Sequence, residues 1–158
     1  MKIETKGIIT AAIIAALYVV LTEVSALFNM SSGVIQLRLS EALYALAWFT
    51  PFAIPGLFIG CIISNLLTGA IVWDVIFGSI ATLIGGMGTY YFRNNRIISL
   101  LCPVVSNAVI VPLVLKYAYG IPGALWYFII TVGVGELISC VVFGYALGKT
   151  FGKYKILK

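Results

Sequence analysis

The sequence contains no histidine and very few charged residues. Without histidine, the chain lacks the commonest general base and the commonest metal ligand of proteins. Charged residues make up only 9% of the 158 residues, whereas soluble domains carry roughly 25%. Hydrophobic residues make up 62%, which also excludes a disordered chain. The composition therefore predicts a single integral membrane domain over residues 1–158, with no room for a separate catalytic module.

The motifs of redox, zinc and nucleotide chemistry are also missing. Cys61, Cys102 and Cys140 stand alone in apolar runs, without a CxxC pair, so we interpret them as small buried side chains. Lys149 and Thr150 imitate the end of a Walker A motif, but the glycines before them are one residue too close together and no strand precedes them. We therefore expect no catalytic residue, no metal and no cofactor in this chain, and we expect no nucleic-acid partner.

Polar breaks divide the chain into six apolar segments. They are Gly7–Phe28, Leu39–Phe49, Phe52–Gly69, Asp74–Phe92, Ile97–Tyr117 and Gly123–Gly148. The second segment is short and ends before Pro51, which cannot continue a helix without losing a hydrogen bond. The alternative is one kinked helix over residues 39–69, about 46 Å long against roughly 30 Å of hydrocarbon. Length favours the break, and the sequence predicts an all-α, polytopic bundle of six transmembrane helices.

The positive charges indicate the orientation of this bundle. With six crossings and both termini in the cytoplasm, eight basic residues lie inside and two, Arg38 and Lys116, lie outside. The best arrangement with five crossings gives seven inside and three outside. Because lysine and arginine are enriched on the cytoplasmic side, six crossings with both termini cytoplasmic is the better prediction.

Small residues recur at helical spacing in three places. Gly56 with Gly60, and Gly144 with Gly148, predict close packing between helices of this chain. The first apolar segment carries a stripe of alanines at the same spacing: Ala11, Ala12, Ala15 and Ala16. Two interpretations of the stripe stand, one being internal packing and the other a docking surface for another membrane protein.

Polar side chains within the membrane indicate where a solute binds. Glu136 lies near the middle of the last segment, where a carboxylate costs about 2.5–3.5 kcal/mol even on the mildest scale. Asn107 lies level with it, so we expect a cavity that both side chains line and that opens to the outside. Glu41 and Asp74 begin segments on the outer side. Acids on that side favour a cationic or donor-rich solute.

Each of these residues also has a simpler interpretation. Asn107 can cap a backbone break at the flanking prolines, and Glu136 can hydrogen-bond a neighbouring helix. Glu41 and Asp74 can be helix N-caps or acids favoured in the first turn of a helix, with Arg38 pairing to Glu41. Trp73 can belong to the aromatic belt at the interface, or stack on a solute at the mouth of a pocket.

Several stretches of the sequence resemble the QueT family. They are Gln36-Leu37-Arg38-Leu39-Ser40-Glu41-Ala42-Leu43, Phe49–Cys61, Asp74–Ser79, Pro103 with Asn107-Ala108, and Gly135-Glu136. Together they extend from about Ile35 to Gly144. The resemblance implies a substrate-binding S component of an energy-coupling factor (ECF) transporter, located in the bacterial cell membrane. It also implies two kinds of partner, a membrane coupling subunit and two cytoplasmic ATPase subunits, with the alanine stripe as docking surface.

The family is associated with queuosine precursors, which are 7-deazaguanine bases such as the 7-aminomethyl form. On that basis we expect Glu136 to accept hydrogen bonds from the guanine edge and Glu41 to hold the aminomethyl group. Asn107 would complete the contacts to the base edge. Gln36 and Arg38 would lie in the loop that closes the pocket. The alternative function is a stand-alone, proton-coupled secondary transporter with Glu136 as its proton site, whereas an enzyme is disfavoured for want of a nucleophile and base.

Overall fold

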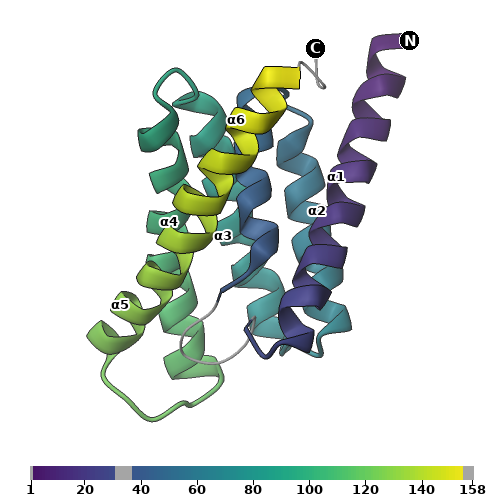
Figure 1. Cartoon of the computed structure of the whole chain (residues 1–158). Helices are drawn as coiled ribbons and strands as arrows, with labels where there is room; N and C mark the ends of the chain where they lie inside the picture. The colour runs from purple at the N-terminus through teal and green to yellow at the C-terminus, as the bar shows by residue number, and fades with distance from the viewer. Residues whose placement is uncertain (1, 31–36, 155–158) are drawn as a thin grey trace.

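The computed structural model describes residues 2–30 and 37–154, and these residues form helices and short connections, with no strand among them. The helices in chain order are α1 (Lys2–Leu27), the 3-10 helix η1 (Leu39–Trp48), α2 (Ala53–Leu67), α3 (Val72–Tyr91), α4 (Arg96–Leu113), the π-helical η2 (Val114–Ala118), α5 (Leu125–Glu136), the π-helical η3 (Leu137–Phe143) and α6 (Gly144–Tyr154). The helices run side by side as a bundle (Figure 1). The predicted all-α fold is confirmed.

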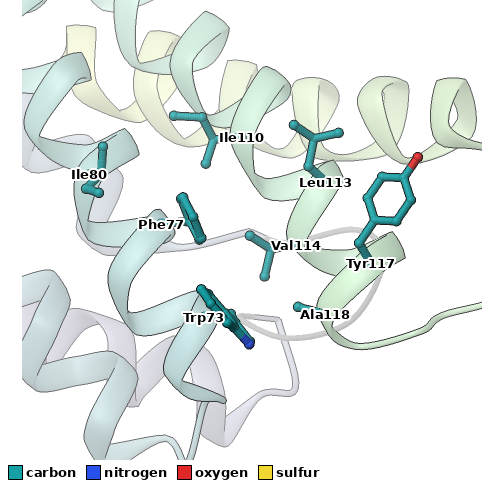
Figure 2. A pocket seen from close by; sticks show the side chains of 8 residues that line it. All are labelled: Trp73, Phe77, Ile80, Ile110, Leu113, Val114, Tyr117 and Ala118. Atoms are coloured by element: carbon teal, nitrogen blue, oxygen red, sulfur yellow. The ribbon is translucent and has the colours of Figure 1, made fainter.

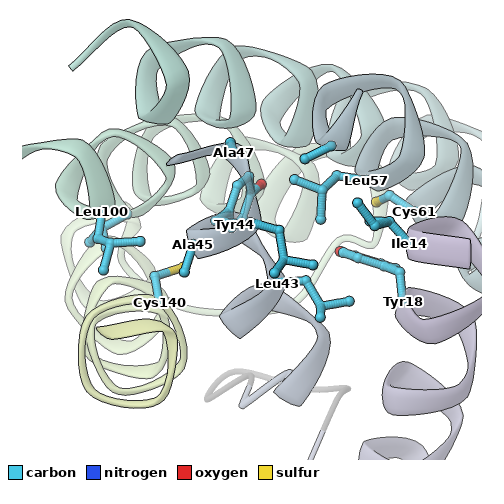
Figure 3. Close-up of a cluster of buried hydrophobic side chains, with 13 residues drawn as sticks. Ile14, Tyr18, Leu43, Tyr44, Ala45, Ala47, Leu57, Cys61, Leu100 and Cys140 are labelled. Carbon is cyan, nitrogen blue, oxygen red and sulfur yellow. The ribbon is translucent and has the colours of Figure 1, made fainter. Parts of the chain in front are cut away.

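The short helix η1 lies in the centre of this bundle. Every residue from Ser40 to Ala47 is buried, because α1, α2, α3, η3 and α6 all pack around η1. Figure 3 shows Tyr44 and its neighbours between Tyr18 of α1 and Cys140 of η3. A 3-10 helix of ten residues is unusually long. The predicted break is confirmed, since η1 ends at Trp48 and α2 begins at Ala53, on either side of Pro51.

Four helical stretches are long and apolar enough to cross a membrane. They are Thr5–Leu27, Val72–Tyr91, Arg96–Ala118 and Leu125–Lys153, whereas α2 and η1 are shorter. The last stretch joins α5, η3 and α6, so the predicted end at Gly148 was too early. The start of α1 and the end of α6 lie at the same end of the bundle (Figure 1).

Both glycine pairs lie where helices pack against each other, as predicted. A Cβ on Gly56 would lie 2.7 Å from the carbonyl oxygen of Ala11, and one on Gly60 would lie 2.7 Å from the Cβ of Tyr18. These contacts bring α2 against the inward-facing side of α1. On α6, a Cβ on Gly148 would overlap the ring of Trp48, so α6 packs directly on the end of η1.

The two prolines inside α4 leave the helix continuous. Pro103 has no N–H to donate to the carbonyl of Ser99, one turn earlier. The hydroxyl of Thr89 on α3 lies 3.1 Å from that carbonyl and 2.8 Å from the carbonyl of Gly85. A neighbouring helix thus satisfies the group that Pro103 frees, and Asn107 is not needed as a cap there.

We predict that Gly60→Ala destabilises the protein by about 1–3 kcal/mol, because the new methyl group meets Tyr18 and the backbone of α1. Gly86→Ala is the matched control. It also lies inside a helix, but its Cβ would have its nearest neighbours at 3.8 Å. Both changes gain about 1 kcal/mol of helix propensity. Thermal unfolding in detergent compares them, and equal melting temperatures would contradict the close contact between α1 and α2.

Candidate functional site

Two acids that are far apart in the sequence meet in the centre of the bundle. Glu41 lies in the first turn of η1 and is 2% exposed, while Glu136 ends α5 and is 5% exposed. One carboxylate oxygen of each and the Sγ of Cys140 all lie within 4.8 Å of one another. We call Glu41 and Glu136 the acid pair. Two carboxylates at such a distance repel each other unless a proton or a positive group lies between them.

Glu41 is only half satisfied by its protein neighbours. The hydroxyl of Tyr18 donates to Oε1 of Glu41 at 2.5 Å. The other oxygen, Oε2, is buried and accepts no hydrogen bond of good geometry from the described residues, although the Tyr44 hydroxyl lies near this carboxyl group. A buried acceptor without a donor costs about 1–3 kcal/mol, and more when it is charged. The acid pair therefore includes an acceptor that a ligand's N–H group would satisfy.

Glu136 is held from its own helix and from α4. The thiol of Cys140, one turn later in η3, donates to its Oε2 at 3.2 Å. Asn107 of α4 lies beside the same carboxyl group and is 4% exposed. The prediction that Glu136 and Asn107 are level is thus confirmed. In this conformation both side chains are almost sealed from solvent, so the predicted opening to the outside stays a prediction.

The three atoms of Glu41, Glu136 and Cys140 are also spaced so that a cation could lie between them. The sequence predicts no metal here, and that stays a prediction. Donor groups of an organic ligand and a metal ion would use the same oxygens, so a chelator distinguishes the two experimentally.

A second polar group of residues lies around the start of α3. The Tyr119 hydroxyl donates to Oδ2 of Asp74 at 3.0 Å, and Nδ2 of Asn65 donates to the Asp74 carbonyl at 3.5 Å. Nη1 of Arg38 donates to Oδ1 of Asn65 at 3.4 Å. The Arg38 guanidinium also interacts electrostatically with Asp74 and Glu41. Arg38 therefore connects this group to the acid pair.

Helix capping does not account for Glu41 and Asp74. Both stand in the first turn of their helices, but Arg38 and Ile71 occupy the N-cap positions. The two acid side chains are buried and bonded to Tyr18 and Tyr119 from other elements. The places of both acids in the first turn agree with the simpler interpretation, and their burial adds that both side chains face the interior of the bundle.

The remaining predicted site residues lie elsewhere. Trp73 is 57% exposed and stacks on Phe77, with their ring centroids 5.9 Å apart. It lines an apolar groove of about 570 Å³, which has α3 on one side and the end of α4 and η2 on the other (Figure 2). The groove residues are apolar or aromatic, unlike the neighbours of the acid pair. Gln36 lies outside the described residues.

Tyr18, Asn65 and the hydrogen bond of Cys140 were not predicted from the sequence. A signal for Tyr18 was present, because Tyr18, Thr22 and Ser25 recur at helical spacing along one face of an apolar helix. All three are buried towards η1, and Thr22 donates to the Ser40 hydroxyl at 2.8 Å. Cys140 is buried as predicted, but it also donates a hydrogen bond to Glu136 and so is more than a small apolar side chain.

The alanine stripe borders a groove on the outside of the bundle. Ala12 and Ala16 are exposed, while Ala15 is buried against α2. Ala11, Ala12, Ala15 and Ala16 line this groove, which has a volume of about 860 Å³, lies between α1 and α2 and is otherwise lined by apolar side chains. The stripe therefore packs internally at one edge and leaves a smooth apolar surface at the other.

We predict that Tyr18→Phe destabilises the protein by about 1–3 kcal/mol, because Glu41 then loses its hydroxyl donor while remaining buried. The control is Tyr145→Phe, whose ring is 40% exposed and for which we expect a change within about 0.5 kcal/mol. Thermal unfolding in detergent measures both. A Tyr18→Phe protein as stable as the control would mean that the Tyr18–Glu41 hydrogen bond contributes nothing.

Comparison with known proteins identifies the family. The sequence profile of the QueT transporter family matches residues 8–153. The protein named queuosine precursor transporter QueT of Lactococcus lactis subsp. cremoris (strain MG1363) is 47% identical over 83 residues, which are 52% of this chain and 48% of the relative. The match thus spans about half of the relative's length, and no solved structure matches the chain. The chain belongs to the QueT transporter family and is a multi-pass protein of the bacterial cell membrane, not an enzyme.

Proposed function

We propose that this chain is the substrate-binding S component of an ECF-type importer and that it captures a queuosine precursor from outside the cell. The substrate class is a 7-deazaguanine base, such as the 7-aminomethyl form. Family membership and the name of the Lactococcus relative support the substrate class. The observation that carries the proposal is the acid pair, buried in the bundle with one carboxylate oxygen unsatisfied.

The chemistry of an aminomethyl deazaguanine complements this pair. The guanine edge presents an N1–H and an exocyclic amine side by side, and one carboxylate can accept from both in a bidentate arrangement. We assign this role to Glu136, with Asn107 completing the contacts because an amide both donates and accepts. The protonated aminomethyl group would lie next to Glu41. A positive charge there offsets the repulsion between the two carboxylates, which gives the site a reason to prefer a cationic base.

Residues around the pair have supporting roles in this proposal. Arg38 with Gln36 would close the outer side of the pocket, and Asp74 would hold Arg38 in place through the Asn65 and Tyr119 network. Trp73 is too exposed for the pocket itself, so a stacking role for it requires a movement of α3.

We further propose six crossings with both termini in the cytoplasm. The four long spans account for four crossings, and the shorter η1 and α2 would supply the other two. Helix α1 starts and α6 ends at the same end of the bundle, which is expected for an even number of crossings (Figure 1). That end carries Lys6, Arg96, Lys149 and Lys153, as the positive-inside rule requires.

Import against a gradient would need partners in this proposal. A membrane coupling subunit would dock on the groove beside Ala12 and Ala16, since small side chains allow close helix packing within lipid. Two cytoplasmic ATPase subunits would hydrolyse ATP, and this chain would bind none itself.

One observation favours a second candidate function. Two buried carboxyl groups as close as Glu41 and Glu136 can share a proton, as a proton-coupled secondary transporter requires. The purified chain alone in proteoliposomes decides between the two. Uptake driven by a proton gradient would support the secondary transporter, whereas uptake that needs the coupling module and ATP would support the S component.

We predict that Glu136→Gln and Glu41→Gln each weaken binding of 7-aminomethyl-7-deazaguanine by about tenfold to a hundredfold, because a charge-assisted hydrogen bond is replaced by a neutral one. The measurement is isothermal titration calorimetry in detergent, with EDTA present to exclude a metal-mediated effect. Glu4→Gln is the control, since residue 4 lies about 21 Å along α1 from Tyr18. Unchanged affinity in both acid-pair variants would overturn the proposed substrate site.

We predict that Ala12→Leu and Ala16→Leu abolish co-purification with the ATPase module, because bulk in the groove prevents close approach of a partner helix. Binding of the deazaguanine should stay within about twofold, since both positions face away from the acid pair. Ile13→Phe also adds bulk on an exposed position of α1, but outside the groove, and should keep the complex. Intact complexes in both alanine variants would exclude the groove as docking surface.

A further inference from the structure

The end of the bundle that holds the start of α4 and the end of α6 contains a hollow with basic walls. It has a volume of about 520 Å³, and we call it the basic hollow; it is lined by Arg96, Lys149, Thr150, Gly152 and Lys153. Three cations from two helices therefore surround one concave surface, and none of these lining residues is acidic. None of these residues belongs to the acid pair or to the groove beside the alanine stripe.

Packing around Trp48 positions the walls of the basic hollow. The guanidinium of Arg96 lies over the Trp48 ring, with Cζ 5.1 Å from the ring centroid. The indole N–H donates to the Ser99 hydroxyl at 2.8 Å, which holds the ring against the first turn of α4. Gly148, the residue before Lys149, lets α6 pack directly against the same ring. Arg96 and Lys149 are thus brought together where η1, α4 and α6 pack around the half-buried Trp48.

The electrostatics of this place favour an anion. Arg96 is the first residue of α4, where unpaired backbone N–H groups give a helix its positive end. Charge on the Arg96 and Lys149 side chains adds to that of the helix end. Phosphate groups are the anions that such combinations of helix N-terminus and basic side chains bind most often.

The surface next to the basic hollow is apolar and faces away from the bundle. On α4, Ile97 and Leu101 are 57% and 37% exposed and lie one turn apart. On η3 and α6, Val142 and Tyr145 are 59% and 40% exposed and lead along the helix towards Lys149. A ligand that fits both surfaces has an anionic head and long apolar chains.

We propose that the basic hollow is a binding site for the phosphate headgroup of an anionic phospholipid, whose acyl chains lie along the exposed faces of α4 and α6. This support rests on the orientation proposed above, in which this end of the bundle is cytoplasmic, since basic pockets between transmembrane helices on that side bind such headgroups. An acidic partner protein would use the charges but not the apolar surface beside them, so the lipid is favoured.

The test is lipid titration of the full chain in detergent, followed by native mass spectrometry. Dioleoyl phosphatidylglycerol should bind more tightly than dioleoyl phosphatidylcholine. The triple variant Arg96→Gln, Lys149→Gln and Lys153→Gln should lose this preference, by about fivefold for each charge removed. Lys116→Gln, which removes a basic residue near the end of η2, is the control and should keep the preference.

Each other outcome overturns the proposal. Phosphatidylglycerol binding that is equal in the triple variant and the parent would exclude the hollow as the site. Inorganic phosphate or glycerol 1-phosphate displacing the lipid at equal concentration would indicate a site for a soluble phosphate instead. Unchanged lipid binding with lost association to the ATPase module would indicate an acidic protein partner. If the triple variant does not fold, Lys149→Gln alone, at an exposed position, should still lower lipid affinity about fivefold.

Discussion

Two carboxyl groups that approach each other inside an apolar bundle are the constraint on which this structure depends. Tyr18 donates a hydrogen bond to Glu41, and Cys140 donates one to Glu136, which Asn107 also contacts. The four carboxylate oxygens can accept more hydrogen bonds than the described residues donate to them. Unpaired acceptors are costly in the apolar interior of the bundle. A bundle built only for stability would not keep such a pair. The proposed donor-rich cationic base is a ligand that would pair the free acceptors and offset the repulsion between the two carboxylates.

The helix η1 makes this meeting possible. It has only ten residues, and the surrounding helices fix its position by burying all of its residues from Ser40 to Ala47. Gly148 allows α6 to approach η1 closely, and Gly60 allows α2 to approach α1, which also packs on η1. Helix α1 has two roles as a result. Its inner face presents Tyr18 to Glu41, while its outer face carries Ala12 and Ala16 beside the groove that we propose for docking.

The two ends of the bundle differ in chemistry. Around the start of α3, Asp74, Asn65 and Tyr119 form a hydrogen-bonded group in which Arg38 also takes part. At the other end, Arg96 and Lys149 border the basic hollow, next to exposed apolar faces. This asymmetry suits a protein that would receive a cationic solute at one membrane surface and contact anionic lipid at the other.

The sequence by itself determined the all-α class, the break at Pro51, the glycine contacts and the likeness to QueT, because hydrophobic length, proline and small-residue spacing are local properties. It also indicated Glu41, Glu136 and Asn107, since polar groups in apolar segments stand out without any structure. Only the tertiary structure decided that Glu41 and Glu136 meet, that Tyr18 holds Glu41, and that Trp73 lies on the surface. These facts depend on how η1 packs against α1 and η3, and side-chain partners from distant segments leave no periodic pattern in the chain.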